Sequence, residues 1–284
     1  MSRRDKFSAR NGFRPDLDNP ITIRNDVPDD LRGFLVDLAY ENGISRDSWR
    51  SMVCRHLRVA PDKLNNWGAD NIDREVRSLL ADCPWYYIYD LIEVVANHLE
   101  NDSYREYGAE FQEEINEFFL MRGVGWKLEH GKIIFRGDAG LDRVLAVAVA
   151  TENHNGFLTA SNELHEAIKD LSRRPSPDVT GAIQHAMASL ECVARDLTNS
   201  KETLGAWIKR NRTTFPSPLA ETTEMLWGYA SNHGRHLKEA EEASLEEAEL
   251  ILGICATLGS YLAKKANSNT EEQNSWPPKS QFSP

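Results

Sequence analysis

The feature that most constrains the fold is a helical repeat of apolar residues that runs through most of the chain. An apolar residue that recurs at steps of four and three stays on one side of an α-helix. The clearest example spans 178–197, with Val179, Ile183, Ala186, Leu190, Val193 and Leu197. Similar patterns predict a mainly α-helical protein with helices near 28–42, 48–57, 71–80, 84–99, 106–121, 141–150, 158–171, 203–209, 218–229 and 244–265.

One short stretch departs from the helical period. Two runs of strand-forming residues, 125–129 and 132–135, flank the pair His130 and Gly131. Glycine accepts the positive φ angles of a tight turn, so this stretch predicts a two-stranded β-hairpin within 125–136. Ile21, Thr22 and Ile23 form a candidate for a further short strand.

The length of 284 residues suits two domains, since ordinary domains hold roughly 100 to 200 residues. The clearest break is the run SRRPSP at 172–177. We therefore expect a helical domain with the hairpin over 1–140, a helical connector over 141–175 and a helical bundle over 176–266. The polar, proline-bearing segment 267–284 predicts a disordered tail.

Composition narrows the class of protein. No stretch reaches the roughly 18 apolar residues of a membrane helix, and no apolar segment follows the basic N-terminus, so we expect a cytoplasmic protein. The four cysteines lie far apart and form no CxxC pair, which argues against a zinc knuckle or a disulfide scaffold. A net charge of −11 disfavours non-specific coating of nucleic acid and leaves a small local basic site open.

The densest cluster of chemically capable side chains lies in LWGYASNHGRHLKEAEE, residues 226–242. His233, Arg235 and His236 fall within four residues of one another. Arginine binds phosphate oxygens bidentately and histidine exchanges protons near neutral pH, so the cluster suits cleavage of RNA by its own 2′-hydroxyl. The alternative is that these side chains cap and hydrogen-bond a loop between two helices. No third metal ligand accompanies the two histidines, and we expect neither a metal nor a cofactor.

Several motifs resemble known families of bacterial abortive-infection (phage defence) proteins. The N-terminal half resembles an AbiJ-type N-terminal domain in FSARNGF (7–13), VPDDLRGFL (27–35), WYYIYDLIE (85–93) and the run from EEINEFF to IIFRGD (113–138). The C-terminal half resembles the HEPN-like helical domains of such proteins in Gly181-Ala182, Glu191, TLGAWIK, SPLAETTEMLWGY and the Gly-Arg-His run before an acid-capped last helix.

The resemblance implies a helical bundle, often dimeric, whose active members cut RNA with an arginine followed by four to six residues and a histidine. This chain departs from that spacing at both His233 and His236. The one match is Arg50 with His56, which lies in the wrong domain and is expected by chance. Arg235 and His236 would therefore form a variant site, or the domain has lost catalysis.

Three functions remain open at this stage. The first is a homodimer, formed through the C-terminal bundle, that acts on RNA as a metal-independent ribonuclease or an RNA-binding protein. The second is a non-catalytic module that senses a phage component or partners a separate effector. Its motivation is the acidic charge, the missing strict spacing of arginine and histidine, and one face of the last helix that carries the small residues Gly253, Ala256, Gly259 and Ser260. We expect a neighbouring helix, from this chain or a partner, to approach this thin face closely. The third is nucleotide or small-molecule binding by the aromatic N-terminal domain. None of the three involves a membrane.

Overall fold

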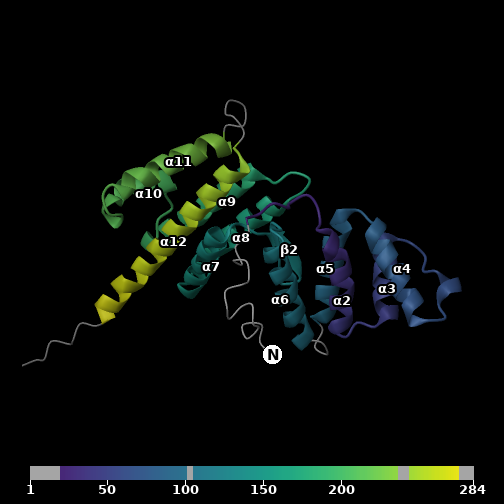
Figure 1. The fold of residues 1–284 in the computed structure, drawn as a ribbon. Helices are drawn as coiled ribbons and strands as arrows, with labels where there is room; N and C mark the ends of the chain where they lie inside the picture. Colours follow the sequence, from purple (N-terminus) through teal and green to yellow (C-terminus); the bar gives the residue numbers. More distant parts are fainter. Residues whose placement is uncertain (1–19, 101–104, 236–242, 275–284) are drawn as a thin grey trace, which may run out of the picture. The chain divides into compact units, whose positions relative to one another are not determined.

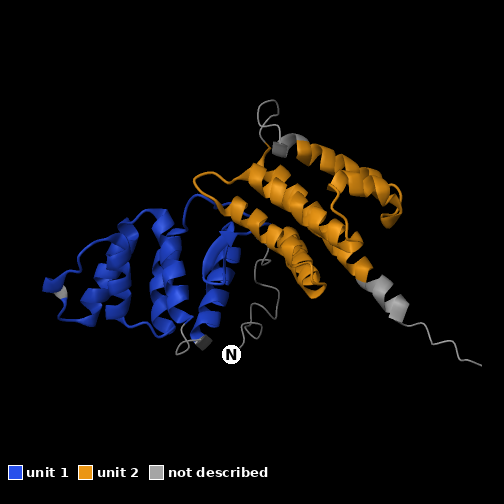
Figure 2. Cartoon of the chain, turned by 180° about the vertical axis from the view of Figure 1, so that it is seen from behind, with its two compact units in different colours: residues 1–138 blue, residues 139–284 orange. Residues whose placement is uncertain are grey.

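A computed structural model describes residues 20–100, 105–235 and 243–274. The chain divides into two compact units, residues 1–138 and 139–284, coloured separately in Figure 2. Eleven α-helices, labelled α2 to α12 in Figure 1, and one two-stranded hairpin fall within the described ranges. The predicted class, mainly α with a small β-hairpin, is confirmed. Within the described ranges, no helix has the length and apolar character needed to cross a lipid bilayer.

Unit 1 is a group of helices around one apolar core. The buried positions of each helix recur at helical spacing, as in α2, where Leu31, Leu35 and Leu38 are at most 2% exposed. Trp49 and Phe111 fill the centre of the same core. The helices are α2 (Asp29–Glu41), α3 (Arg46–Leu57), α4 (Ala69–Asp82), α5 (Trp85–Leu99) and α6 (Arg105–Met121), with a 3-10 turn over Lys63–Asn65.

The hairpin pairs β1 (Trp126–Glu129) with β2 (Lys132–Phe135) in the register that the turn requires. His130 and Gly131 take φ values of 49° and 70°, as expected for a two-residue turn with two positive φ angles. The Asn116 side chain of α6 bonds both backbone groups of Leu128, so it secures the hairpin to α6. The segment 21–23, a candidate for a further short strand, forms one isolated parallel β-bridge, between Ile23 and Val124.

Unit 2 contains α7 (Ala139–His154), α8 (Leu158–Ser172), α9 (Val179–Thr198), α10 (Leu204–Arg210), α11 (Leu219–Arg235) and α12 (Leu245–Asn274), with a 3-10 turn over Arg212–Thr214. α9 is central: α8, α10, α11 and α12 all pack on it, and Figure 1 shows it running beside α12. Ile183, Ala186, Leu190 and Val193 of its apolar seam are buried. α7 and α8, which cover the segment 141–175, pack within this unit on α12 and α9.

The thin face of α12 is occupied by helices of the same chain. Ala256 and Ser260 are buried, and a Cβ atom added at Gly259 would lie 2.7 Å from Oε1 of Glu152 in α7. A Cβ at Gly253 would lie 3.3 Å from the side chain of Leu141, also in α7. The small residues therefore permit a close approach of α7 to α12.

Candidate functional site

Two of the predicted site residues, His233 and Arg235, lie at the end of α11, where the structure describes only the backbone. The sequence pattern placed the end of this helix near Tyr229, but α11 continues to Arg235. His233 and Arg235 therefore belong to its last turn, and Gly234 lies inside the helix. The side chains of His233 and Arg235, and all of His236, lie outside the described residues.

The two helix ends that flank residues 236–242 are held in place by described contacts. In α12, the Ser244 amide donates to Glu247 Oε2 at 2.7 Å and the Glu247 amide donates to Ser244 Oγ at 3.2 Å. This reciprocal pair is the capping box that the sequence predicts. Burial raises the pKa of Tyr229 in α11, and the carboxylate of Glu247 raises it further, which indicates that the two side chains are neighbours. The stretch of α11 around Tyr229 therefore lies close to the start of α12.

A small pocket of about 270 Å³ lies between α9 and α11, on the described part of the helix that leads to Arg235. The Trp227 ring packs on Gly205, where an added Cβ atom would lie 3.0 Å from the ring. Glu191 accepts a bond from the Leu204 amide at 2.8 Å and pairs with Arg195 at 2.6 Å, so its carboxylate supports α10. The lining residues are Gln184, Met187, Ala188, Glu191, Trp227, Ala230 and Ser231.

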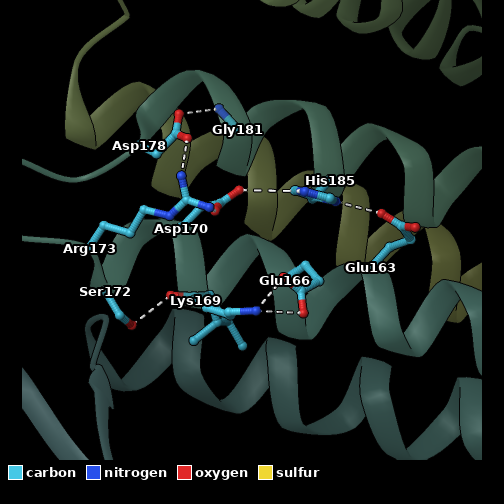
Figure 3. A network of polar contacts seen from close by, with 10 residues as sticks. Glu163, Glu166, Lys169, Asp170, Ser172, Arg173, Asp178, Gly181 and His185 are labelled. Carbon is cyan, nitrogen blue, oxygen red and sulfur yellow. Dashed lines mark hydrogen bonds and ion pairs between the residues drawn. The ribbon is translucent and has the colours of Figure 1, made fainter.

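Figure 3 shows a cluster of charged side chains where α8 meets α9. The His185 ring lies between two carboxylates, with Nδ1 2.6 Å from Glu163 Oε2 and Nε2 3.6 Å from Asp170 Oδ2. Arg173 contacts Asp170 at 2.9 Å and Asp178 at 2.7 Å. We refer to these five residues as the α8–α9 cluster.

The electrostatics of the α8–α9 cluster favour a structural role. The Asp170 side chain is 2% exposed, and its burial raises its pKa while Arg173 opposes that rise. Both ring nitrogens of His185 already face a carboxylate, so the ring has no nitrogen left for a substrate proton. Asp178 caps α9 by accepting from the Gly181 amide at 2.8 Å. The cluster therefore fixes the turn that joins α8 to α9.

Gly181 is required by this cluster, because an added Cβ atom would lie 2.5 Å from Asp170 Oδ2 and 2.8 Å from Asp178 Cγ. Alanine improves helix propensity by about 1 kcal/mol, but overpacking costs about 1–3 kcal/mol. Because Arg173 holds both carboxylates in place, we expect the cost to exceed the gain, so Gly181→Ala should lower the free energy of unfolding by up to about 2 kcal/mol. Urea denaturation followed by circular dichroism measures this change.

Gly228 is the matched control for this substitution. It lies inside α11, and an added Cβ atom meets nothing within 4 Å. Gly228→Ala should therefore leave stability unchanged or raise it by up to about 1 kcal/mol. A stability gain in both variants would show that the carboxylates of Asp170 and Asp178 can move away from a Cβ atom at residue 181 at little cost.

Arg50 and His56, the one pair with the arginine–histidine spacing of active HEPN domains, contact different partners in the structure. Arg50 is 8% exposed and pairs with Asp47 at 3.2 Å and Glu75 at 3.4 Å. His56 instead contacts Asp90 at 3.2 Å. Arg50 is therefore engaged by acidic partners within its own unit, and the pair does not form a common catalytic site.

In the described parts of the chain, no group of three or more His, Cys, Asp or Glu side chains is arranged so that it could hold a metal ion. The four cysteines are free thiols. Burial raises the pKa of Cys255 to about 12, so this thiol stays protonated and unreactive at neutral pH.

These observations define a mainly helical protein with an N-terminal unit of helices and a hairpin, followed by a second helical unit. The AbiJ N-terminal domain 4 family matches residues 5–150, which is more than half of the chain. The chain therefore belongs to this family, which relates it to bacterial abortive-infection proteins. No curated protein and no solved structure matches the chain.

Proposed function

We propose that this protein is a phage-defence effector whose C-terminal helical bundle, predicted over 176–266, is a HEPN-like domain acting on RNA. Membership of the AbiJ N-terminal domain 4 family is the observation that carries the proposal. The helical composition of unit 2 is compatible with a HEPN-like bundle. Within this proposal the N-terminal unit serves regulation or recognition and the C-terminal unit performs the chemistry.

Arg235 and His236 are the groups that would act on RNA, with His233 as a further candidate beside them. The arginine would neutralise the charge that builds up on the phosphate during attack by the 2′-hydroxyl. A histidine would move the proton of that hydroxyl or of the leaving oxygen. A homodimer formed through the C-terminal bundle would bring two copies of each group into one cleft, and no metal ion is needed for either role.

The test is induction of the full chain in bacteria, combined with RNA cleavage by the purified protein in the presence of a metal chelator. We expect growth arrest and RNA fragments from the unmodified protein. A positioned acid–base group contributes about 100- to 10,000-fold to rates and a preorganised group that stabilises charge about 100- to 1,000-fold, so His236→Ala and Arg235→Ala should each abolish both signals. Full activity in both variants would remove these residues from the site.

Two exposed residues of the same unit provide controls. Arg143 and His154 lie on α7, and both are exposed to solvent. Arg143→Ala and His154→Ala make the same chemical changes away from α11 and should retain full activity. Loss of activity in all four variants would indicate a general effect of charge.

A non-catalytic interaction module is the second candidate, and it gains support from the surface of α11. Leu219 and Met225 are 46% and 75% exposed, so this helix presents apolar side chains to solvent. An exposed apolar surface favours a protein partner, whether a second copy, a phage component or a separate effector. This candidate predicts no RNA cleavage and a stable complex by native mass spectrometry.

A further inference from the structure

Unit 1 contains a groove between α3 and α5 that the proposed function does not use. Its volume is about 940 Å³, at the upper end of the range for pockets that bind small molecules. Ser48, Ser51 and His56 line it from α3, and Tyr87 and His98 line it from α5. The groove therefore combines hydroxyl, imidazole and aromatic groups.

Contacts of His56 fix how the two helices meet. Its Nε2 atom lies 3.2 Å from Asp90 Oδ2, and its ring meets the Tyr87 ring edge-on with centroids 5.2 Å apart. The last turn of α3 therefore lies against the first turns of α5. The second ring nitrogen of His56 has no partner within the described ranges and is available to a ligand in the groove.

Two guanidinium groups add positive charge at this end of the groove. Arg55 and Arg58 both line it and are exposed. Among the described residues neither side chain makes an ion pair or a hydrogen bond, whereas Arg50, Arg77 and Arg122 in the same unit are all paired with carboxylates. Asp47 also lines the groove but pairs with Arg50, and the nearby Asp90 contacts His56, so neither carboxylate pairs with Arg55 or Arg58.

Arg58 takes an unusual backbone conformation for its residue type. It caps the C-terminus of α3 with φ 56° and ψ 38°, in the left-handed region where glycine or asparagine is usual. A non-glycine residue there costs roughly 1–2 kcal/mol. The sequence thus places a cation at a position where glycine would be more stable, which points to a role for the side chain.

We propose that this groove binds a phosphorylated small molecule of nucleotide size. The phosphate lies between Arg55 and Arg58, because planar guanidinium groups match phosphate oxygens. The uncharged part of the ligand packs along Met52 and Val94, which line the groove beyond Tyr87. This places a ligand site in the N-terminal unit, separate from the residues proposed to act on RNA.

The first test is calorimetric titration of the full chain with AMP, inorganic phosphate and adenosine. We expect saturable binding of AMP with a Kd below about 1 mM. Inorganic phosphate should compete with AMP, and adenosine should not bind measurably. Adenosine binding as tight as that of AMP would overturn the proposal, since the phosphate would then contribute nothing. Absence of AMP binding, together with absence of phosphate binding, would overturn it as well.

The second test removes the two charges. Arg58→Gly suits the left-handed backbone, and Arg55→Ala leaves a good helix former in place, so both variants should fold. Each should weaken AMP binding about tenfold, because a hydrogen bond to a charged group is worth that much. Arg74→Ala is the matched control, since Arg74 is an exposed arginine of the same unit on α4 and does not line the groove. Unchanged AMP affinity in the Arg55→Ala, Arg58→Gly double variant would overturn the proposal.

Discussion

Ionisation of Glu152 should lower the free energy of unfolding by about 3 kcal/mol as the pH rises from below 4.5 to above 7. Its side chain is 0% exposed, and burial raises its pKa from 4.5 to about 7. The Ser189 hydroxyl opposes this rise, but neither carboxylate oxygen of Glu152 accepts a hydrogen bond from the described residues. The folded state therefore holds this proton more tightly than the unfolded state.

The sign of the effect follows from that difference in proton binding. Below pH 4.5 both states are protonated and the contribution to stability is complete. Between the two pKa values the unfolded state loses its proton first, so folding becomes less favourable as the pH rises. Above about pH 7 both states are ionised and the loss levels off. The relevant window is therefore pH 4.5 to 7.

Glu152→Gln keeps the shape of the side chain and removes its titration. The difference in unfolding free energy between this variant and the unmodified protein should shift by about 3 kcal/mol in favour of the variant between pH 4.5 and pH 8. Urea denaturation at several pH values measures it. Asp196→Asn, at an exposed position of α9, is the control and should follow the unmodified protein at every pH. Parallel profiles for Glu152→Gln and the unmodified protein would contradict the prediction.

Local features of the fold could be predicted because their causes lie within a few residues. The seam of α9 follows from its spacing, and the hairpin turn follows from the positive φ that Gly131 accepts. Ser244 and Glu247 form the expected capping box because a serine and a glutamate three positions apart can each reach the other's amide. These predictions need no knowledge of the rest of the chain.

Features that depend on packing could not be predicted in the same way. The α8–α9 cluster joins Glu163 to His185 across 22 positions, and only the packing of two helices brings them together. A glutamate in a helix is normally expected at the surface, yet Glu152 is buried against Gly259. The small residues of α12 did predict a close neighbour, but only the structure identifies it as α7.

The end of α11 shows how weak a local stop signal can be. Asn232 and Gly234 favour a turn over a helix, and the pattern of apolar residues fades after Tyr229, so the sequence placed the end there. The helix nevertheless continues to Arg235. A glycine inside a helix costs only about 1 kcal/mol relative to alanine, which a continued hydrogen-bond ladder can offset. The candidate residues His233 and Arg235 consequently have a helical backbone conformation.

Trp207→Ala should cost about 3–5 kcal/mol of unfolding free energy, the range for removing a buried tryptophan. Trp207 is 0% exposed, and its Nε1 donates to Thr198 Oγ1 at 2.8 Å, so it anchors α10 to α9. α10 also packs on α11, so its release should weaken the support of the helix that carries Arg235. We expect any activity that depends on Arg235 to fall together with stability.

Trp67→Ala tests the same chemical change at a side chain that is 81% exposed, and it should alter stability by no more than about 0.5 kcal/mol. Thr198→Val separates the hydrogen bond of Trp207 from its packing, and it should cost only about 1 kcal/mol. Urea denaturation compares all three variants. If burial of the indole ring holds α10 in place, Trp207→Ala must exceed Thr198→Val severalfold. Equal losses of unfolding free energy in these two variants would mean that the hydrogen bond to Thr198, rather than the packing of the indole ring, holds α10 on α9.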